Sequence, residues 1–272
     1  MLNRNKEGTP DLERCCDVCH SADSKRVDAY SEAQWPLVEC LSCGFIYLKQ
    51  VPEYEALSDE LAWEKQHAQE AKRRRKSIGG ALDAATRWRL VLGKMFDDRV
   101  LTQQRRSSGN ILDVGCAGTC ANVPLGATPF GIEVSEALAR KAAPEFEARG
   151  GQVFHGPAHE GLDCFEGIQF SSVYMRSYLE HEAQPRIVLE KAFKRLEPGG
   201  TVHLRVPNFG SPNRIVMGRR WSGFRFPDHV NYFTSPSLRR LAESIGFQYR
   251  RVNGWSLFDD NLMVVLTKPA SS

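Results

Sequence analysis

The stretch from about residue 108 to residue 270 alternates short apolar runs with longer amphipathic segments. Short apolar runs are typical of buried strands, and amphipathic segments are typical of helices that pack on one face. Their alternation predicts an α/β fold, with a mostly parallel sheet of seven strands and helices on both of its faces. The expected strands are Asn110–Gly115, Phe130–Val134, Gln152–His155, Phe170–Met175, Thr201–Val206, Tyr249–Val252 and Leu262–Thr267.

Local end signals delimit three helices between these strands. A helix over Ser135–Ala143 begins at a serine N-cap and ends before Pro144, because proline cannot donate the helical hydrogen bond. A second helix over Pro185–Leu196 is stopped by a Pro-Gly-Gly sequence, and a third over Ser235–Ile245 is followed by glycine. The last two strands are joined by a short turn, so we expect one strand to run antiparallel to the rest.

The chain has 272 residues, which is enough for about two domains. It divides into a cysteine-rich domain over residues 1–50, a helical linker or cap over residues 51–107, and the α/β domain over residues 108–272. A net charge of +3 excludes a polybasic, histone-like protein. No apolar run approaches the length of a membrane span, and the polar start lacks the apolar core of a signal peptide, so we expect a cytoplasmic protein with no membrane partner.

Two cysteine pairs stand out in the first domain. Cys16 and Cys19 form one C-x-x-C pair, and Cys40 and Cys43 form a second. Two such pairs supply the four thiolates that zinc prefers in a closed structural site, so we predict a zinc ribbon, with Cys15 outside it. The alternative is a set of unrelated buried or redox-active cysteines. A ribbon could bind nucleic acid, a substrate or a partner, or only hold the N-terminus in place.

A loop of small residues follows the first strand of the α/β domain, within Ile111–Thr119. Small residues allow a ligand to approach the backbone closely. Asp113 ends that strand, and Glu133 ends the next strand 20 residues later. An acid at the second position accepts hydrogen bonds from the ribose hydroxyls of an adenosine. The pattern therefore predicts a nucleoside site at the carboxyl ends of the two strands.

The loop also restricts which nucleotide can bind. Ala117 and Cys120 stand where a dinucleotide fingerprint needs glycines, and the Lys-Ser/Thr of a P-loop is absent. Because Asp113 places a carboxylate before the loop, a cationic ligand fits better than a pyrophosphate. The sulfonium and ammonium groups of S-adenosylmethionine meet this requirement. The alternative is a turn whose small residues only pack.

Several motifs together resemble class I S-adenosylmethionine-dependent methyltransferases, over about residues 108–268. They match a subgroup with an EH…P…PGG…PN signature and a later W…P-x-H…F…L…GF block, and several members carry an N-terminal C-x-x-C ribbon. The resemblance implies a Rossmann-like sheet and an S-adenosylmethionine-binding methyltransferase domain over residues 108–272. The matching segments are Ile111–Gly118, Gly131–Ser135, Leu179–His181, Pro185, Leu196–Gly200, Val206–Asn208, Trp221, Pro227–His229, Phe233, Leu238 and Gly246–Phe247.

The resemblance also implies cofactor contacts at matching positions. The sequence departs from the family pattern at Ala117 and Thr119, where many relatives have glycine, and at His159, where an acid is common. The implied contacts are Asp113, Gly115, Cys116 and Gly118 at the methionine end, Glu133 at the ribose, Val134 against the adenine, Ala158 and His159 at the adenine edge, and Met175 on the sulfonium side.

Two histidines are candidate catalytic residues. A hydroxyl acceptor of a methyl group needs a proton acceptor, and histidine titrates near neutral pH. His181 follows the fourth strand, and His229 lies in a long aromatic loop after the fifth, suited to a substrate lid. The alternative for both rings is structural, as hydrogen-bonded organisers of their loops. Glu180 and Asp228 could orient either ring.

Two basic stretches bear on the substrate. Arg214, Arg219, Arg220 and Arg225 share the aromatic loop, which predicts a substrate with an anionic group. The run Lys72–Lys76 is either a solvated helix face or a contact for phosphate.

The leading hypothesis is therefore a methyltransferase that uses S-adenosylmethionine and a zinc ribbon and acts on a small molecule such as a sugar or glycan precursor. The second is an RNA methyltransferase that holds RNA with the ribbon and the basic run. The third is a zinc-ribbon binding protein whose α/β domain lacks catalysis.

Overall fold

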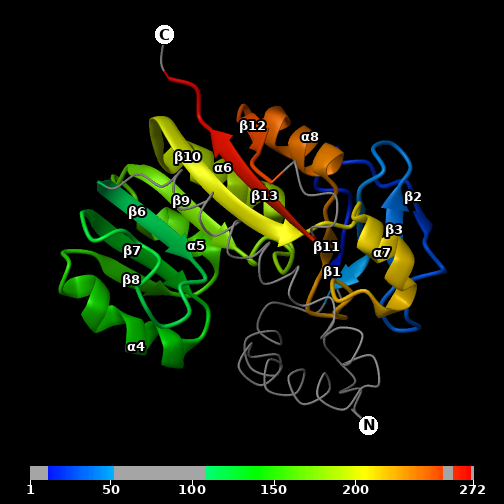
Figure 1. Ribbon diagram of the computed structural model, residues 1–272, viewed down its shortest axis with the longest axis horizontal. Helices are drawn as coiled ribbons and strands as arrows, with labels where there is room; N and C mark the ends of the chain where they lie inside the picture. The colour runs from blue at the N-terminus through cyan, green and yellow to red at the C-terminus, as the bar shows by residue number, and fades with distance from the viewer. Residues whose placement is uncertain (1–11, 52–107, 254–259, 271–272) are drawn as a thin grey trace.

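The computed structural model describes residues 12–51, 108–253 and 260–270 (Figure 1). Nearly all of the predicted helical linker over residues 51–107, including the basic run Lys72–Lys76, lies outside the described residues. Two bodies are visible: a large sheet covered by helices, and a smaller set of strands drawn in blue beside it. In the described parts of the chain, we find no helix with the length and apolar character needed to cross a bilayer.

The large sheet has seven strands in the order β12-β13-β10-β9-β6-β7-β8. Neighbours from β10 through β8 are parallel, whereas β13 is antiparallel to both β10 and β12. The sheet is therefore mixed, and the predicted single antiparallel strand is confirmed. The strands are β6 (Gly109–Val114), β7 (Ala127–Glu133), β8 (Gln152–His155), β9 (Phe170–Arg176), β10 (Leu196–Pro207), β12 (Gln248–Arg251) and β13 (Asn261–Thr267).

Helices cover both faces of this sheet, as predicted. On one face, α5 (Ala158–Cys164), α6 (Pro185–Arg195) and α8 (Ser235–Ile245) bury apolar side chains against the main core. On the other face, α4 (Glu136–Glu147) packs Phe146 against Gly131 of β7, where an added Cβ would lie 3.0 Å from the ring. The absence of a side chain at Gly131 thus sets how closely α4 approaches the sheet.

One helix end was predicted wrongly. The helix α4 runs through Pro144 to Glu147 instead of ending at Ala143. Proline removes one hydrogen bond, but Ala142 and Phe146, one turn apart, are both fully buried. Their burial stabilises the last turn more than the lost bond weakens it. The predicted end of α8 is confirmed, because Gly246 adopts the left-handed conformation (φ 111°) that caps it.

The N-terminal strands form an antiparallel sheet with a strand from the far end of the sequence. β2 (Ser24–Arg26), β3 (Leu37–Cys40) and β4 (Ile46–Leu48) follow one another, and β11 (Asn231–Tyr232) pairs with β4. A separate pair joins β1 (Leu12–Glu13) to β5 (Gln50–Val51). Residues 12–51, called the N-terminal unit below, therefore share a sheet with the α/β part of the chain.

An aromatic cluster fills the space beneath this shared sheet. The segment after β10 contains α7 (Pro212–Met217) and a 3-10 turn, Gly218–Arg220. Trp221 is buried there and its ring lies 5.3 Å from that of Phe224, which stacks on Tyr30 of the N-terminal unit at 5.0 Å. The aromatic loop is thus packed against the N-terminal unit.

Candidate active site

The loop after β6 adopts the backbone conformations that its small residues permit. Gly115 and Gly118 have positive φ angles of 74° and 80°, and Ala117 has a φ of 53°. A positive φ is rare for alanine. The Ala117 N–H donates to the Glu133 carboxylate at 2.9 Å, so a buried charge supports the strained residue. The loop is therefore fixed by the acid at the end of the neighbouring strand.

Glu133 accepts two backbone hydrogen bonds at the carboxyl end of β7. Besides the Ala117 N–H at Oε2, the Ser135 N–H donates to Oε1 at 3.0 Å. A carboxylate has about four lone-pair positions, so each oxygen retains one for a further donor. The side chain is 6% exposed, and its geometry allows it to accept hydrogen bonds from a nucleoside ribose.

Asp113 lies at the same edge of the sheet, on the adjacent strand. It pairs in register with Gly131, two residues before Glu133, and it is 1% exposed. The Asn122 amide donates to Asp113 Oδ2 at 3.0 Å. Burial, together with the charges of Glu133 and Asp113, raises the pKa of the Cys116 thiol to about 12, which places both carboxylates near this thiol. Asn122 was not foreseen, because nothing in its local sequence points to Asp113.

The remaining predicted cofactor contacts occupy different environments. Cys116 is buried against α4, so only its backbone lies along the loop. Val134 is 37% exposed, and Ala158 and His159 begin α5, which follows the neighbouring strand β8. Met175 is fully buried in the main core within β9. The structure therefore brings the loop, Asp113 and Glu133 together, and it places the Met175 side chain in the core.

A second polar group lies just after β9. His181 contacts Asp228 through Nδ1, which is 3.0 Å from Oδ1 and 2.9 Å from the Asp228 main-chain oxygen. The rings of His181 and His229 meet edge to face, with centroids 4.7 Å apart. Glu180 Oε1 lies 3.9 Å from His181 Nε2. The structure thus unites both predicted histidines with both acids expected to orient them.

Burial sets the charge states in this group. Burial and the charge of His181 lower the pKa of His229 to about 3, so its ring is neutral. Burial alone would lower the pKa of His181, but the hydrogen bond to Asp228 and the charge of Glu180 raise it above its ordinary value. Burial raises the pKa of Glu180 against the opposing charges of His181 and Arg205.

The His181 loop also contacts the cofactor loop. The Tyr178 ring lies 3.6 Å from the position that a Cβ on Gly115 would occupy. The Tyr178 hydroxyl donates to Glu182 at 2.6 Å. A group held between these loops would therefore lie near both the small-residue loop and the histidines.

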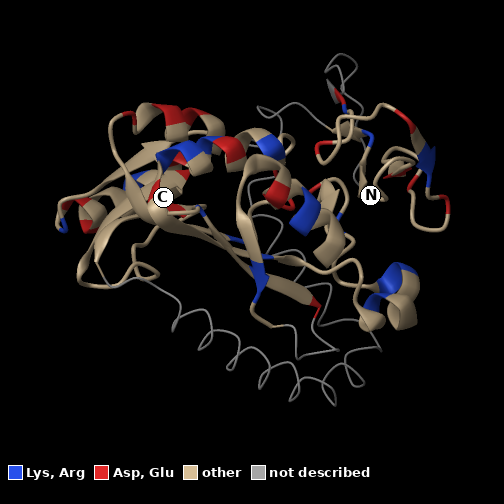
Figure 2. Ribbon diagram, turned by 90° about the horizontal axis from the view of Figure 1, so that it is seen from above, with Lys and Arg blue, Asp and Glu red and all other residues tan. Residues whose placement is uncertain are grey.

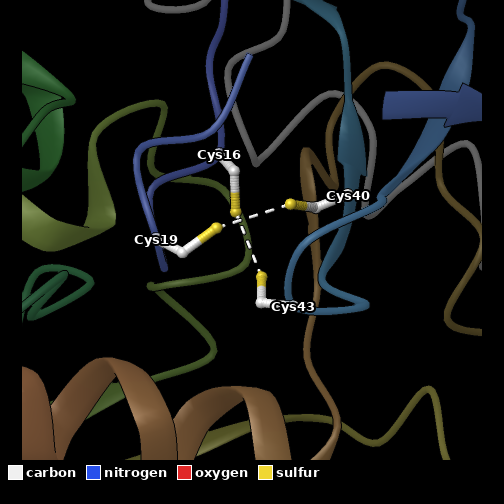
Figure 3. A group of neighbouring side chains, drawn as sticks. All are labelled: Cys16, Cys19, Cys40 and Cys43. Atoms are coloured by element: carbon white, nitrogen blue, oxygen red, sulfur yellow. Dashed lines mark hydrogen bonds between the residues drawn. The ribbon is translucent and has the colours of Figure 1, made fainter. Parts of the chain in front are cut away.

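The four predicted zinc ligands converge in the N-terminal unit (Figure 3). The sulfurs of Cys16 and Cys43 are 3.4 Å apart, and those of Cys19 and Cys40 are 3.5 Å apart. Although burial opposes it, hydrogen bonds from nearby backbone N–H groups lower the pKa of Cys40 to about 7. Cys15 is exposed and lies outside the group.

Each cysteine pair is closed by a residue with positive φ. His20 follows the first pair at 62°, and Gly44 follows the second at 72°. The Gly44 N–H donates to the Cys40 carbonyl at 2.9 Å, which closes the tight turn predicted there. Because the two turns face each other, all four thiols lie within 4.8 Å.

Two of the predicted loop arginines contact the N-terminal unit, and a third lies beside the histidine pair. Arg214 stacks over Phe209 at 4.3 Å and donates to the Tyr30 hydroxyl, and Arg219 donates to the Ser31 carbonyl. Arg225 lies 3.4 Å from Asp228 and so stands beside the histidine pair. Elsewhere, positive and negative residues are interspersed along the helices (Figure 2).

Residues 87–252 match the model of a family described as "Methyltransferase domain". This match spans more than half of the chain, so the chain belongs to this family and is an S-adenosylmethionine-dependent methyltransferase of unspecified substrate. No curated protein sequence matches the chain.

Solved structures with a similar backbone fold include the following three methyltransferases. A SAM-dependent methyltransferase from Archaeoglobus fulgidus is 12% identical with a TM-score of 0.49, and the match covers 65% of this chain and 94% of that one. The N-methyltransferase NodS from Bradyrhizobium japonicum is 16% identical with a TM-score of 0.43, covering 64% and 93%. An O-methyltransferase family protein from Burkholderia thailandensis is 13% identical with a TM-score of 0.46, covering 79% and 71%.

Proposed function

We propose that this methyltransferase transfers the methyl group of S-adenosylmethionine to a small molecule that lies between the cofactor loop and the pair His181 and His229. The observation that carries the proposal is the position of two buried carboxylates at the ends of β6 and β7. His181 follows the adjacent strand β9 and packs against His229 from the loop after β10. Ligands of open α/β sheets bind at this edge.

The two carboxylates have different tasks. Asp113 places a negative charge beside the loop, which suits the cationic methionine end of the cofactor. Glu133 retains acceptor positions for the ribose hydroxyls. Val134, Ala158 and His159 follow at the ends of β7 and β8 and would contact the adenine. Met175 would act only as core support for this edge.

Methyl transfer requires little covalent chemistry from the protein. A lone pair of the acceptor attacks the methyl carbon, the carbon–sulfur bond breaks, and sulfur keeps the electron pair. The protein has to align these atoms, exclude water and remove the acceptor's proton. The His181 side chain is 21% exposed, whereas His229 is buried, so His181 is the ring that an acceptor can reach.

The substrate would carry an anionic group, as in a sugar phosphate or a glycan precursor. Arg225 supports this choice, since its guanidinium lies beside Asp228 and hence beside the histidine pair. Arg214 and Arg219 donate to groups of the N-terminal unit, so the anion would contact Arg225.

The four cysteines would bind one zinc ion as a structural site. Four ligands at zinc–sulfur distances of about 2.3 Å lie roughly 3.8 Å apart in a tetrahedron. The measured separations of 3.4 and 3.5 Å are close to this value. Zinc would hold the two turns of the ribbon together, and residues 1–50 would form the ribbon unit.

Calorimetric titration with S-adenosylhomocysteine tests the cofactor site. We expect tight binding to the wild type and at least about tenfold weaker binding to Asp113→Asn. The control Glu136→Gln should bind like the wild type, because that side chain is exposed and pairs with the likewise exposed Arg140. Equal binding by Asp113→Asn and wild type would overturn the assignment.

A labelling experiment tests the acceptor. Protein given cofactor with a labelled methyl group is incubated with an extract of small anionic metabolites or with total RNA. Label in the small-molecule fraction supports the proposal, and label only in RNA would replace it with the RNA methyltransferase. His181→Asn should bind S-adenosylhomocysteine normally and lose turnover.

A further inference from the structure

One carboxylate and two imidazole rings lie together in the candidate site, beyond the end of β9. Glu180, His181 and His229 each offer one ligand atom, and these atoms lie within 4.8 Å of one another. Glu180 and His229 are buried, whereas His181 is partly open to solvent. The group follows the carboxyl end of β9 and shares no residue with the group of four cysteines.

Hydrogen bonding fixes the tautomers of both rings. His181 Nδ1 lies 2.9 Å from the Asp228 main-chain oxygen, and His229 Nδ1 lies 2.8 Å from the Gly223 main-chain oxygen. A carbonyl oxygen can only accept, so both Nδ1 atoms carry the proton. In the neutral form of each ring the lone pair is therefore on Nε2, the atom with which histidine commonly binds a metal.

Glu180 completes the set. Its Oε1 lies 3.9 Å from His181 Nε2, and its Oε2 is buried with no hydrogen-bond partner among the described residues. A buried carboxylate oxygen without a partner is costly. Its main chain is fixed, because the Glu180 carbonyl accepts from the N–H groups of Val230 and Asn231. A cation between the carboxylate and the two Nε2 atoms would satisfy this oxygen.

We propose that Glu180, His181 and His229 bind one divalent transition-metal ion, and that the methyl acceptor binds at its open position. This rests on the proposed methyltransferase function and specifies how its acceptor is activated. Two histidines and one carboxylate are a recurrent ligand set for zinc and for ferrous iron, and such sites leave positions open.

The supporting contacts fit this role. In metal sites, the second nitrogen of a ligating histidine usually donates to a carboxylate or a carbonyl, as both rings do here. Asp228 acts on His181 as a positioning residue, and Arg225 anchors Asp228 at 3.4 Å. Ligand atoms around zinc lie about 3.3 Å apart, whereas Glu180 Oε1 and His181 Nε2 are 3.9 Å apart, so the group would contract on binding.

The ion would change the chemistry of the acceptor. A hydroxyl bound to a divalent cation has a lowered pKa, loses its proton to solvent and presents an oxygen lone pair to the methyl carbon. The two rings would then hold the cation, and the charge of the cation would do the work otherwise assigned to a histidine base. A hydroxylated acceptor, such as a sugar or a phenol, is the expected class.

Metal analysis of the full chain tests the site separately from activity. After equilibrium dialysis against zinc, we expect two ions per wild-type chain, with a sulfur shell and a nitrogen–oxygen shell in the X-ray absorption spectrum. Cys40→Ser should lose only the sulfur-bound ion. Glu180→Gln and His181→Gln should each lose only the other ion, and Asp228→Asn should bind that ion about 10–100-fold more weakly.

Binding of S-adenosylhomocysteine serves as the control, because it should be unchanged in Glu180→Gln and His181→Gln. If the wild type does not bind S-adenosylhomocysteine, the proposed function is contradicted. If the wild type binds S-adenosylhomocysteine but holds one ion per chain, only the metal site is contradicted. Retention of two ions by Glu180→Gln and His181→Gln would also contradict the metal site. The wild-type stoichiometry decides the question even where a variant does not fold.

Discussion

Replacing Glu133 by glutamine should weaken the protein and the cofactor site together. Glu133 accepts hydrogen bonds from the N–H groups of Ala117 and Ser135, one at each carboxylate oxygen. Glutamine has the same shape but only one acceptor oxygen. Its amide N–H₂ group would therefore face one of the two backbone N–H groups, and that donor would lose its partner in a buried position.

The magnitude follows from these two contacts. Hydrogen bonds to a charged group contribute about 1.5–3 kcal/mol, and a buried unpaired donor costs about 1–3 kcal/mol. One contact is lost and the other loses its charge, so the free energy of unfolding should fall by about 2–4 kcal/mol. Ala117, whose φ of 53° depends on this support, should be the first point to relax.

Thermal unfolding and S-adenosylhomocysteine titration measure the two effects. A fall of this size lowers Tm by about 4–16 °C for a chain of this size. Glu136→Gln, three residues along the chain, is the matched control, because its carboxylate is exposed and should change stability by less than about 1 kcal/mol. A Glu133→Gln protein with wild-type Tm would refute the reasoning, whatever its cofactor affinity.

Three further predictions concern other residues. Iodoacetamide at pH 8 should label the exposed Cys164 and spare the native Cys116, whose pKa is raised by burial; equal labelling in peptide mass spectra would contradict this. Hydrogen bonds from the loop after β6 lower the pKa of the Glu145 carboxyl below its ordinary value of 4.5. The carboxylate therefore stabilises the folded chain above pH 4.5, and this contribution is lost as the pH falls through the lower pKa of the folded state. The urea midpoints of Glu145→Gln and wild type should therefore differ at pH 7 and converge in acid. Arg14→Met should lower the free energy of unfolding by about 3–5 kcal/mol, because it removes a buried guanidinium that pairs with the partly buried Asp17 and donates to Val230 and Asn231. Arg26→Met at an exposed pair should cost less than about 1 kcal/mol in the same denaturation assay.

The main sheet could be predicted from the sequence because most of its strands are local apolar runs. The helix ends were predicted where a residue type fixes the backbone, as at Gly246. The prediction was wrong at Pro144, where burial of the following turn outweighs a local preference. The strand β11 was missed, because it has two residues and its partner in β4 lies far away in sequence.

The candidate site divides in the same way. Asp113 and Glu133 could be placed because parallel strands bring their carboxyl ends to one edge. The sequence offered Asp228 as a partner for either histidine, but it could not show that His181 is the one, because the two residues are 47 positions apart and Asp228 lies in a loop without periodicity. The buried Glu180 oxygen, which has no hydrogen-bond partner in the part of the chain that the structure describes, is likewise a product of long-range packing.

The N-terminal unit is hydrogen-bonded to the loops of the candidate site and is not a separately tethered domain. Arg14 donates to the carbonyl of Val230 at 3.2 Å and to the side chain of Asn231 at 2.7 Å. Asn231 in turn donates to the carbonyl of Leu179 at 2.9 Å, and the Val230 N–H donates to the carbonyl of Glu180 at 2.8 Å. The loops that carry both histidines are therefore hydrogen-bonded to each other and to the N-terminal unit. Loss of the zinc ion proposed for the cysteine cluster should therefore lower the Tm of the whole chain, which loss of an ion from a tethered accessory unit would not do.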